Sequence, residues 1–112
     1  MKIEIRTIGD AQILDCSGKL MLGEGTMSIR NAVGDALKSG TKKIILNLAD
    51  ISYIDSSGVG ELALAYTLVI NSGWRLKLLH LPKRIREVLA ITRVLPLFEV
   101  FDDEKAILAS FG

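Results

Sequence analysis

The chain is short, almost neutral in charge and poor in chemically specialised residues. Its 112 residues are 49% hydrophobic and 24% charged, with a formal net charge of +1, a composition typical of one folded domain over residues 1–112. A single cysteine, Cys16, and a single histidine, His80, exclude an internal disulfide and a zinc site built from Cys and His ligands. We expect no metal, and because no disulfide can form within the chain we expect a cytoplasmic location.

Neither a membrane segment nor a nucleic-acid site is indicated. The uncharged run 62–70 has about half of the roughly 18 residues that a membrane span needs. The N-terminus alternates charged with apolar residues, unlike a signal peptide. Six basic residues against one acidic residue in segment 75–93 give a local charge of +5, which favours a solvated helix face over a nucleic-acid patch. We expect no direct nucleic-acid partner and no membrane partner.

The N-terminal residues are predicted to form a β-hairpin. Apolar and polar residues alternate over Lys2–Thr7, which is the pattern of a half-buried strand, and Ala11–Ser17, with Ile13, Leu14 and Cys16, is predicted as a second strand paired back on the first. The turn residues Gly9-Asp10 stand between the two segments, and Gly18 is predicted to end the second strand.

A helix and a central strand are predicted next. Apolar residues recur at helical spacing over 29–37, and Gly40 is placed to end that helix. The preceding loop 23–25 has two glycines but lacks the third of a dinucleotide fingerprint, so a flexible loop is favoured over a nucleotide site. The nearly continuous apolar run Lys42–Leu48 predicts a strand covered on both faces, followed by a loop over 50–54.

The second half of the chain alternates helices with strands. The predicted elements are a helix from Ser57 or Gly58 to about Asn71, a strand over Arg75–Leu81, a helix with Pro82 in its first turn, a strand over Leu97–Phe101, and a helix from Asp102 with Ala106, Ile107 and Phe111 inward. This order predicts an α/β fold in which an N-terminal antiparallel hairpin joins a mostly parallel sheet with covering helices.

The segment 50–60 is the strongest candidate for a functional site. It places two serine hydroxyls where a loop enters a long helix. One interpretation is ordinary capping, in which Asp55, Ser56 or Ser57 accepts the free N–H groups of the first turn. The other is a serine presented for phosphorylation, because a helix N-terminus favours a phosphate locally. Residues 44–74 carry three acids and no Lys or Arg, so a phosphate there would make the segment strongly negative.

Enzyme motifs are missing from the sequence. It contains no phosphate-binding P-loop, no Gly-x-Ser-x-Gly elbow and no Cys-x-x-Cys pair, and we expect neither catalysis nor a cofactor. His80 could serve Ser56 or Ser57 as a general base only if the fold brought them together. Its apolar strand context favours a histidine that makes a routine hydrogen bond, so a small hydrolase is the least favoured hypothesis.

The hexapeptide Asp-Ser-Ser-Gly-Val-Gly at 55–60, after an apolar strand and Asp-Ile-Ser-Tyr-Ile, resembles the signature of the STAS family of anti-sigma factor antagonists. Segments in the family's order elsewhere are Ser17-Gly18-Lys19-Leu20, Leu76-Lys77-Leu78, 91–98 and 102–111. The resemblance implies a STAS-like single domain of a bacterial, cytoplasmic phosphoprotein. It also implies that Ser57, rather than Ser56, is the phosphorylated serine.

The same resemblance implies partners and a regulatory role in transcription. In this family an ATP-dependent serine kinase, which is also the anti-sigma factor, phosphorylates the antagonist, and a PP2C-type phosphatase reverses the reaction. The unphosphorylated protein would sequester the kinase and release the sigma factor, docking through Asp55, Ser56, Ser57, Gly58, Val59 and Gly60. Family members often carry an aspartate where this sequence has Met21. A non-switching STAS module, either a signalling scaffold or a small lipid-transporter subunit, is the alternative.

Overall fold

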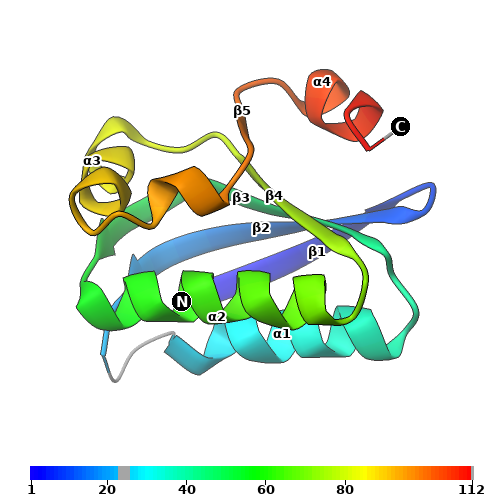
Figure 1. The fold of residues 1–112 in the computed structure, drawn as a ribbon, viewed down its shortest axis with the longest axis horizontal. Coiled ribbons are helices and arrows are strands. Elements are labelled where there is room, and N and C mark those ends of the chain that lie inside the picture. The colour runs from blue at the N-terminus through cyan, green and yellow to red at the C-terminus, as the bar shows by residue number, and fades with distance from the viewer. Residues whose placement is uncertain (23–25, 112) are drawn as a thin grey trace.

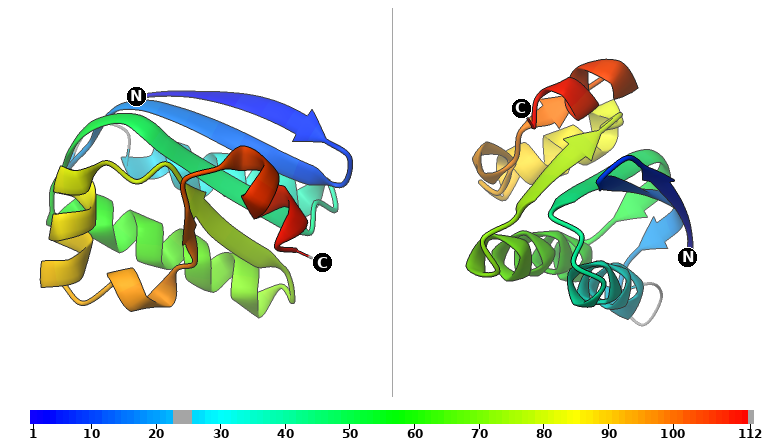
Figure 2. Two further views of the ribbon diagram at one scale, coloured as in Figure 1. Left: turned by 90° about the horizontal axis from the view of Figure 1, so that it is seen from above. Right: turned by 90° about the vertical axis from the view of Figure 1, so that its right-hand side faces the viewer.

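Five strands form one mixed sheet, with α1 and α2 on one face and α4 on the other (Figures 1 and 2). The computed structural model describes residues 1–22 and 26–111. The strands are β1 Lys2–Ile8, β2 Ala11–Leu20, β3 Lys43–Ile54, β4 Arg75–Leu79 and β5 Val100–Phe101. The helices are α1 Thr26–Lys38, α2 Ser56–Asn71, α3 Lys83–Ile91 and α4 Glu104–Ala109, with a short 3₁₀ helix at Leu95–Leu97.

The sheet order is β1-β2-β3-β4-β5, and only the β1–β2 pair is antiparallel. This arrangement confirms the predicted α/β fold of a hairpin joined to a parallel sheet with covering helices. The predicted glycine-containing loop 23–25 lies outside the described residues.

Two hydrophobic clusters lie on opposite faces of the sheet. The larger one packs the inner sides of α1 and α2 against the sheet, and it includes Ile44 and Leu46. The smaller one lies under α4 and contains Ile13, Ile45, Leu79 and Ile107. Successive residues of β3 therefore face opposite clusters, as the prediction of a strand covered on both faces requires.

Two predicted strands were too short. Gly18 does not end β2, which continues to Leu20 through a register shift at Gly18. Gly18 has φ +111, a conformation that glycine tolerates within a β-bulge. The predicted loop over 50–54 is wrong as well, because β3 continues to Ile54 and pairs with this extension of β2.

The C-terminal strands were predicted too long. β4 ends at Leu79, because His80 takes a left-handed conformation with φ 54 and leaves the strand. Only Val100 and Phe101 form β5, since Leu97 belongs to the 3₁₀ helix and Phe98 lies in a bend after it. Ile107 of α4 is buried and Phe111, two residues beyond the end of this helix, packs beside it as predicted, but Ala106 is exposed.

Candidate functional site

Asp55 caps the N-terminus of α2 and ties it to the end of β2. Its carboxylate Oδ1 accepts the N–H of Gly58 at 2.9 Å, and Oδ2 accepts the N–H of Leu22 at 3.0 Å. The backbone N–H of Asp55 donates to the carbonyl of Leu20 at 3.2 Å. Of the three capping candidates, Asp55 therefore fills the role, and the serine hydroxyls are not used for it.

The N–H groups of Leu22 and Gly58 that bind the Asp55 carboxylate hold the pKa of this group below its usual range. Lowering the pH through this depressed pKa is expected to release both N–H groups, because their hydrogen bonds favour the ionised form. The amide proton shifts of Leu22 and Gly58, followed by NMR, are expected to titrate together with a midpoint below that of an ordinary aspartate. Asp55→Asn is expected to abolish this titration, and independent midpoints for the two amides would contradict the shared anchor.

Gly58 allows the end of β2 to approach α2 closely. A Cβ atom at position 58 would lie 2.2 Å from the Leu20 carbonyl oxygen and 2.8 Å from Ile54 Cγ1. Gly60, by contrast, has nothing within 4 Å of the place where its Cβ would stand. The first glycine is therefore a structural requirement of the site, whereas the second leaves its surface open.

The two serines differ in exposure, and both are available to another molecule. Ser56 is exposed and Ser57 is half-buried. Within residues 1–22 and 26–111, no hydrogen bond or ion pair occupies either hydroxyl. Two of the residues proposed for docking differ in position. Val59 belongs to the buried core and supports the site from inside, whereas Gly60 lies on the surface.

One cation from outside the 44–74 segment pairs with an acid of the segment, and a second lies on the neighbouring strand. Glu61, one helical turn after Ser57, is only 6% exposed and accepts a hydrogen bond from Arg30 of α1 at 2.5 Å. Lys19 lies on β2 opposite Tyr53, one residue before the strand position whose carbonyl binds Asp55. The charge map of the sequence therefore overstated the local negative charge, because Arg30 compensates Glu61. Asp55 is left as the main acid beside Ser57.

An apolar hollow of about 410 Å³ next to the loop was not foreseen from the sequence. It is lined by Lys19, Met21, Ser52 and Tyr53. Leu22, which follows directly, is 74% exposed although its backbone is tied to Asp55. The only sequence signal was the polar pattern of 50–54, which was interpreted as a loop rather than as a strand with exposed side chains.

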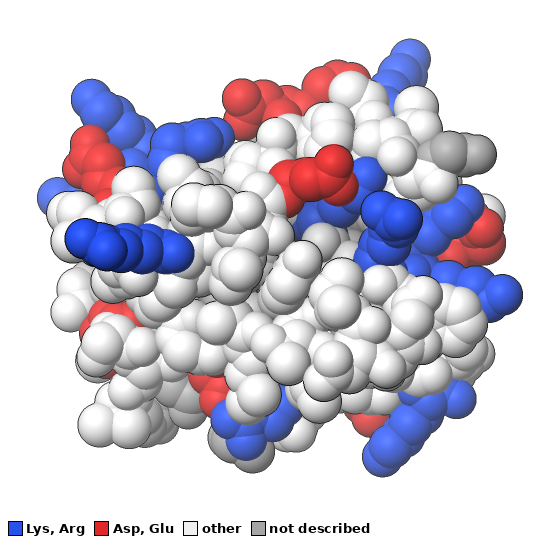
Figure 3. Space-filling model, in the orientation of Figure 1, with Lys and Arg blue, Asp and Glu red and all other residues white. Residues whose placement is uncertain are grey.

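The outward face of α2 carries no charge. Its one charged residue, Glu61, is buried. The exposed residues of the helix are Ser56, Gly60, Leu64, Thr67, Ile70 and Asn71. Figure 3 shows a largely uncharged surface over the middle of this helix, with Lys and Arg gathered elsewhere. An uncharged surface that starts at the two serines suits contact with another protein.

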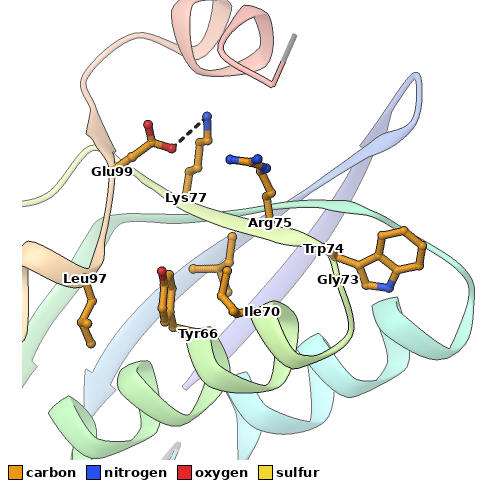
Figure 4. A pocket seen from close by; sticks show the side chains of 9 residues that line it. Tyr66, Ile70, Gly73, Trp74, Arg75, Lys77, Leu97 and Glu99 are labelled. Atoms are coloured by element: carbon orange, nitrogen blue, oxygen red, sulfur yellow. Dashed lines mark ion pairs between the residues drawn. The ribbon is translucent and has the colours of Figure 1, made fainter.

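A cleft of about 470 Å³ lies at the other end of α2, beside the part of β4 that β5 does not cover (Figure 4). Tyr66, Ile70 and Leu97 form its apolar side, and Arg75, Lys77 and Glu99 its polar side. Lys77 pairs with Glu99 at 3.0 Å and also donates to the carbonyl and the hydroxyl of Ser110, just beyond α4. This lysine therefore holds the C-terminal segment on the sheet.

Lys77→Met is expected to loosen the C-terminal segment while the rest of the sheet stays folded. The variant keeps the buried volume but loses two charge-assisted hydrogen bonds to Ser110 and the ion pair with Glu99, and we expect a loss of about 1–2 kcal/mol in the free energy of unfolding. Urea denaturation and hydrogen exchange of α4 amides would measure it. Lys105→Met, on the exposed side of α4, is the control and should change neither. Unchanged α4 exchange in Lys77→Met would refute the anchoring role.

His80 and Cys16 are the side chains to consider for nucleophilic or metal chemistry in the described part of the chain. No hydrogen bond joins His80 to Ser56 or Ser57 among these residues, and no group of three or more His, Cys, Asp or Glu gathers there. Burial raises the pKa of the Cys16 thiol to about 12, so the thiol is protonated near neutral pH. Within the same residues, no helix has the length and apolar character needed to cross a membrane.

The chain is similar to known proteins both in its sequence pattern and in its fold. The family model of the STAS domain matches residues 2–107. A candidate anti-sigma factor antagonist from Thermotoga maritima superposes with a TM-score of 0.86 at 23% identity, covering 96% of this chain and 92% of the other. The phosphorylated form of the Bacillus cell fate determinant SpoIIAA gives 0.72 at 22% identity, with 97% and 99% covered.

A transporter-related protein matches as well. A sulfate transporter family protein from Wolinella succinogenes gives a TM-score of 0.79 at 19% identity, with 94% of this chain and 87% of the other covered. No curated protein matches the chain. At these identities the solved structures establish a shared fold.

Proposed function

Because the chain belongs to the STAS domain family, we propose that it is an anti-sigma factor antagonist that works as a phosphorylation-controlled switch. The unphosphorylated form binds a serine-kinase anti-sigma factor in the cytoplasm, and the sigma factor is released. The observation that carries this proposal is Ser57, whose hydroxyl has no partner within the described residues and stands where an uncharged helix face begins.

The switch follows from the charge that phosphorylation adds. The kinase transfers the γ-phosphoryl group of ATP to the Ser57 oxygen, the hydroxyl proton is lost and ADP leaves. A PP2C-type phosphatase hydrolyses the ester, restoring the hydroxyl and releasing phosphate. The domain itself holds no cofactor and performs no catalysis in this scheme. The added phosphate carries nearly two negative charges beside the ionised Asp55, on a surface otherwise suited to close contact.

Direct phosphorylation tests this function. The purified chain is incubated with ATP and each candidate serine kinase of its own genome, and intact mass followed by peptide mapping locates the phosphate. We expect one phosphoryl group on Ser57, retained in Ser56→Ala and lost in Ser57→Ala. Ser56 is the matched control because it is the adjacent and more exposed hydroxyl. A chain that no kinase phosphorylates at Ser57 is not such a switch.

A second candidate is a STAS module that does not switch, either a signalling scaffold or a small lipid-transporter subunit. The similarity to the sulfate transporter family protein supports it, because the fold alone does not separate the two roles. Genes for a transporter ATPase beside this one would favour the second candidate, and a regulatory kinase gene would favour the first. Co-purification with the corresponding neighbour would decide between them.

A further inference from the structure

The outer edge of β1 pairs with no strand in the described chain. β1 is the first strand in the sheet order and pairs only with β2. It is seven residues long, lies along one side of the molecule (Figure 2), and exposes Ile5 by 54% and Ile8 by 37%. A long edge with exposed isoleucines is a ready template for another strand.

The turn of the hairpin determines which backbone groups face outward. Gly9, with φ +59, occupies the first central position of a two-residue turn between Ile8 and Ala11, as a type II′ turn requires. Ile8 and Ala11 form the closing hydrogen-bonded pair of such a turn, and bonding alternates along an antiparallel ladder. The N–H and C=O groups of Ile3, Ile5 and Thr7 are therefore directed away from β2.

The sequence of β1 complements itself when a second copy is placed antiparallel about Ile5. Each Ile5 then lies opposite Ile5 of the second copy, and each Glu4 lies opposite Arg6 of the second copy. A two-fold axis at Glu4 would instead pair Glu4 with itself and Lys2 with Arg6, both like-charged. Only opposite charges face each other across the pair in the Ile5-centred register, which also uses all seven residues.

Arg6 is already positioned for this contact. Its guanidinium donates to Asp15 at 2.6 Å and to Glu104 at 2.8 Å, and its side chain remains 41% exposed. Glu4 pairs only with the exposed Lys2 at 2.9 Å, within residues 1–22 and 26–111. Three hydrogen bonds hold the guanidinium in place through Nε and Nη2, and Nη1 donates to no group among the described residues. A carboxylate arriving from a second copy would therefore meet Nη1 of an ordered guanidinium, and little side-chain entropy would be lost.

We propose that two copies of this chain form a symmetric dimer through β1, joining their sheets into one. Each of the outward pairs, Ile5 with Ile5 and Ile3 with Thr7 in both directions, exchanges two main-chain hydrogen bonds. The β1 edge is separated by β2 from β3, the strand whose end leads into α2 and Ser57. The dimer therefore leaves both Ser57 sites free, and this proposal does not depend on the proposed function.

Sedimentation velocity over a range of concentrations tests the dimer. We expect a reversible monomer–dimer equilibrium for the unmodified chain, and Ile5→Lys is expected to raise its dissociation constant at least tenfold, because two lysines would then oppose each other. Leu64→Lys, at an exposed apolar position on α2, is the control and should leave the dimer unchanged. Thermal unfolding checks that the variants fold. A chain that stays monomeric at all concentrations overturns the proposal.

Oxidative cross-linking tests the register separately. In the proposed pairing the two Cα atoms of residue 5 lie about 5.5 Å apart, within disulfide range. Ile5→Cys is therefore expected to give a covalent dimer, while Ile8→Cys, which lies opposite Lys2 of the second copy, is not. The native Cys16 is buried and does not interfere. Equal cross-linking of both variants, or none of Ile5→Cys, overturns the Ile5-centred pairing. Phosphorylation of Ser57 should alter neither result.

Discussion

Gly58→Ala is expected to lower the free energy of unfolding by about 3 kcal/mol, roughly 10–20 °C in Tm for a domain of this size. The new methyl group would stand 2.2 Å from the Leu20 carbonyl oxygen, which is a main-chain atom and cannot rotate away. Relief requires that β2 and α2 separate, and the Asp55 bonds to Leu22 and Gly58 would then lengthen. Denaturant unfolding measures the loss.

The matched variant is Gly60→Ala, two residues further along the same helix turn. Nothing lies within 4 Å of the new methyl group, and alanine favours a helix interior over glycine, so this change is expected to stabilise by up to about 1 kcal/mol. The two substitutions are chemically identical and differ only in what the methyl group meets. If Gly58→Ala and Gly60→Ala changed the free energy of unfolding by similar amounts, the close approach of Gly58 to Leu20 would not hold the site together.

Ser57 phosphorylation is expected to weaken binding of the serine-kinase anti-sigma factor about a hundredfold. A penalty of about 3 kcal/mol follows if the phosphate must be desolvated or must face a carboxylate in the complex. Ser57→Asp, which carries a smaller charge, should weaken binding at least tenfold, whereas Ser57→Ala should keep the affinity of the unmodified chain. Isothermal titration against the purified kinase measures all three.

Ser56→Asp separates a local effect from a general increase in negative charge. It adds the same charge as Ser57→Asp one residue earlier, where the side chain is exposed rather than half-buried. We expect a smaller loss of affinity than in Ser57→Asp. Equal affinity of Ser57→Asp and Ser57→Ala would reject repulsion as the basis of the switch, and it would do so without affecting the dimer through β1.

The order of strands and helices could be predicted because each element has its own apolar periodicity. The run at 44–46 and the helical stripe from Val59 to Val69 predict their elements locally, and the structure confirms both. The ends of the strands could not be predicted in the same way. Glycine is disfavoured within strands, but Gly18 lies in a bulge of β2 that continues because β2 pairs with β3. Partner strands, rather than local residues, determine where β2 and β3 end.

The candidate site shows the same division. The pattern of acid, two serines and glycine at 55–58 predicts where the candidate site lies, and Asp55, one of the predicted caps, is confirmed in that role. The contacts of Arg30 with Glu61 and of Leu22 with Asp55 join residues 31 and 33 positions apart, so no local pattern reveals them. The apolar hollow beside Tyr53 likewise exists only when β2 and β3 are paired.

The hydrogen bonds of Asp55 link α2 to the end of β2, and they determine when the loop with the two serines reaches its native conformation during folding. Leu22 and Asp55 are 33 residues apart, and the parallel pairing of β2 with β3 must form before they meet. The entropy of closing that loop is lost before any bond at the site compensates it. A short peptide containing residues 50–61 would therefore display the hydroxyls on an unstructured chain. A kinase that recognises the folded surface would phosphorylate only protein that has completed its folding.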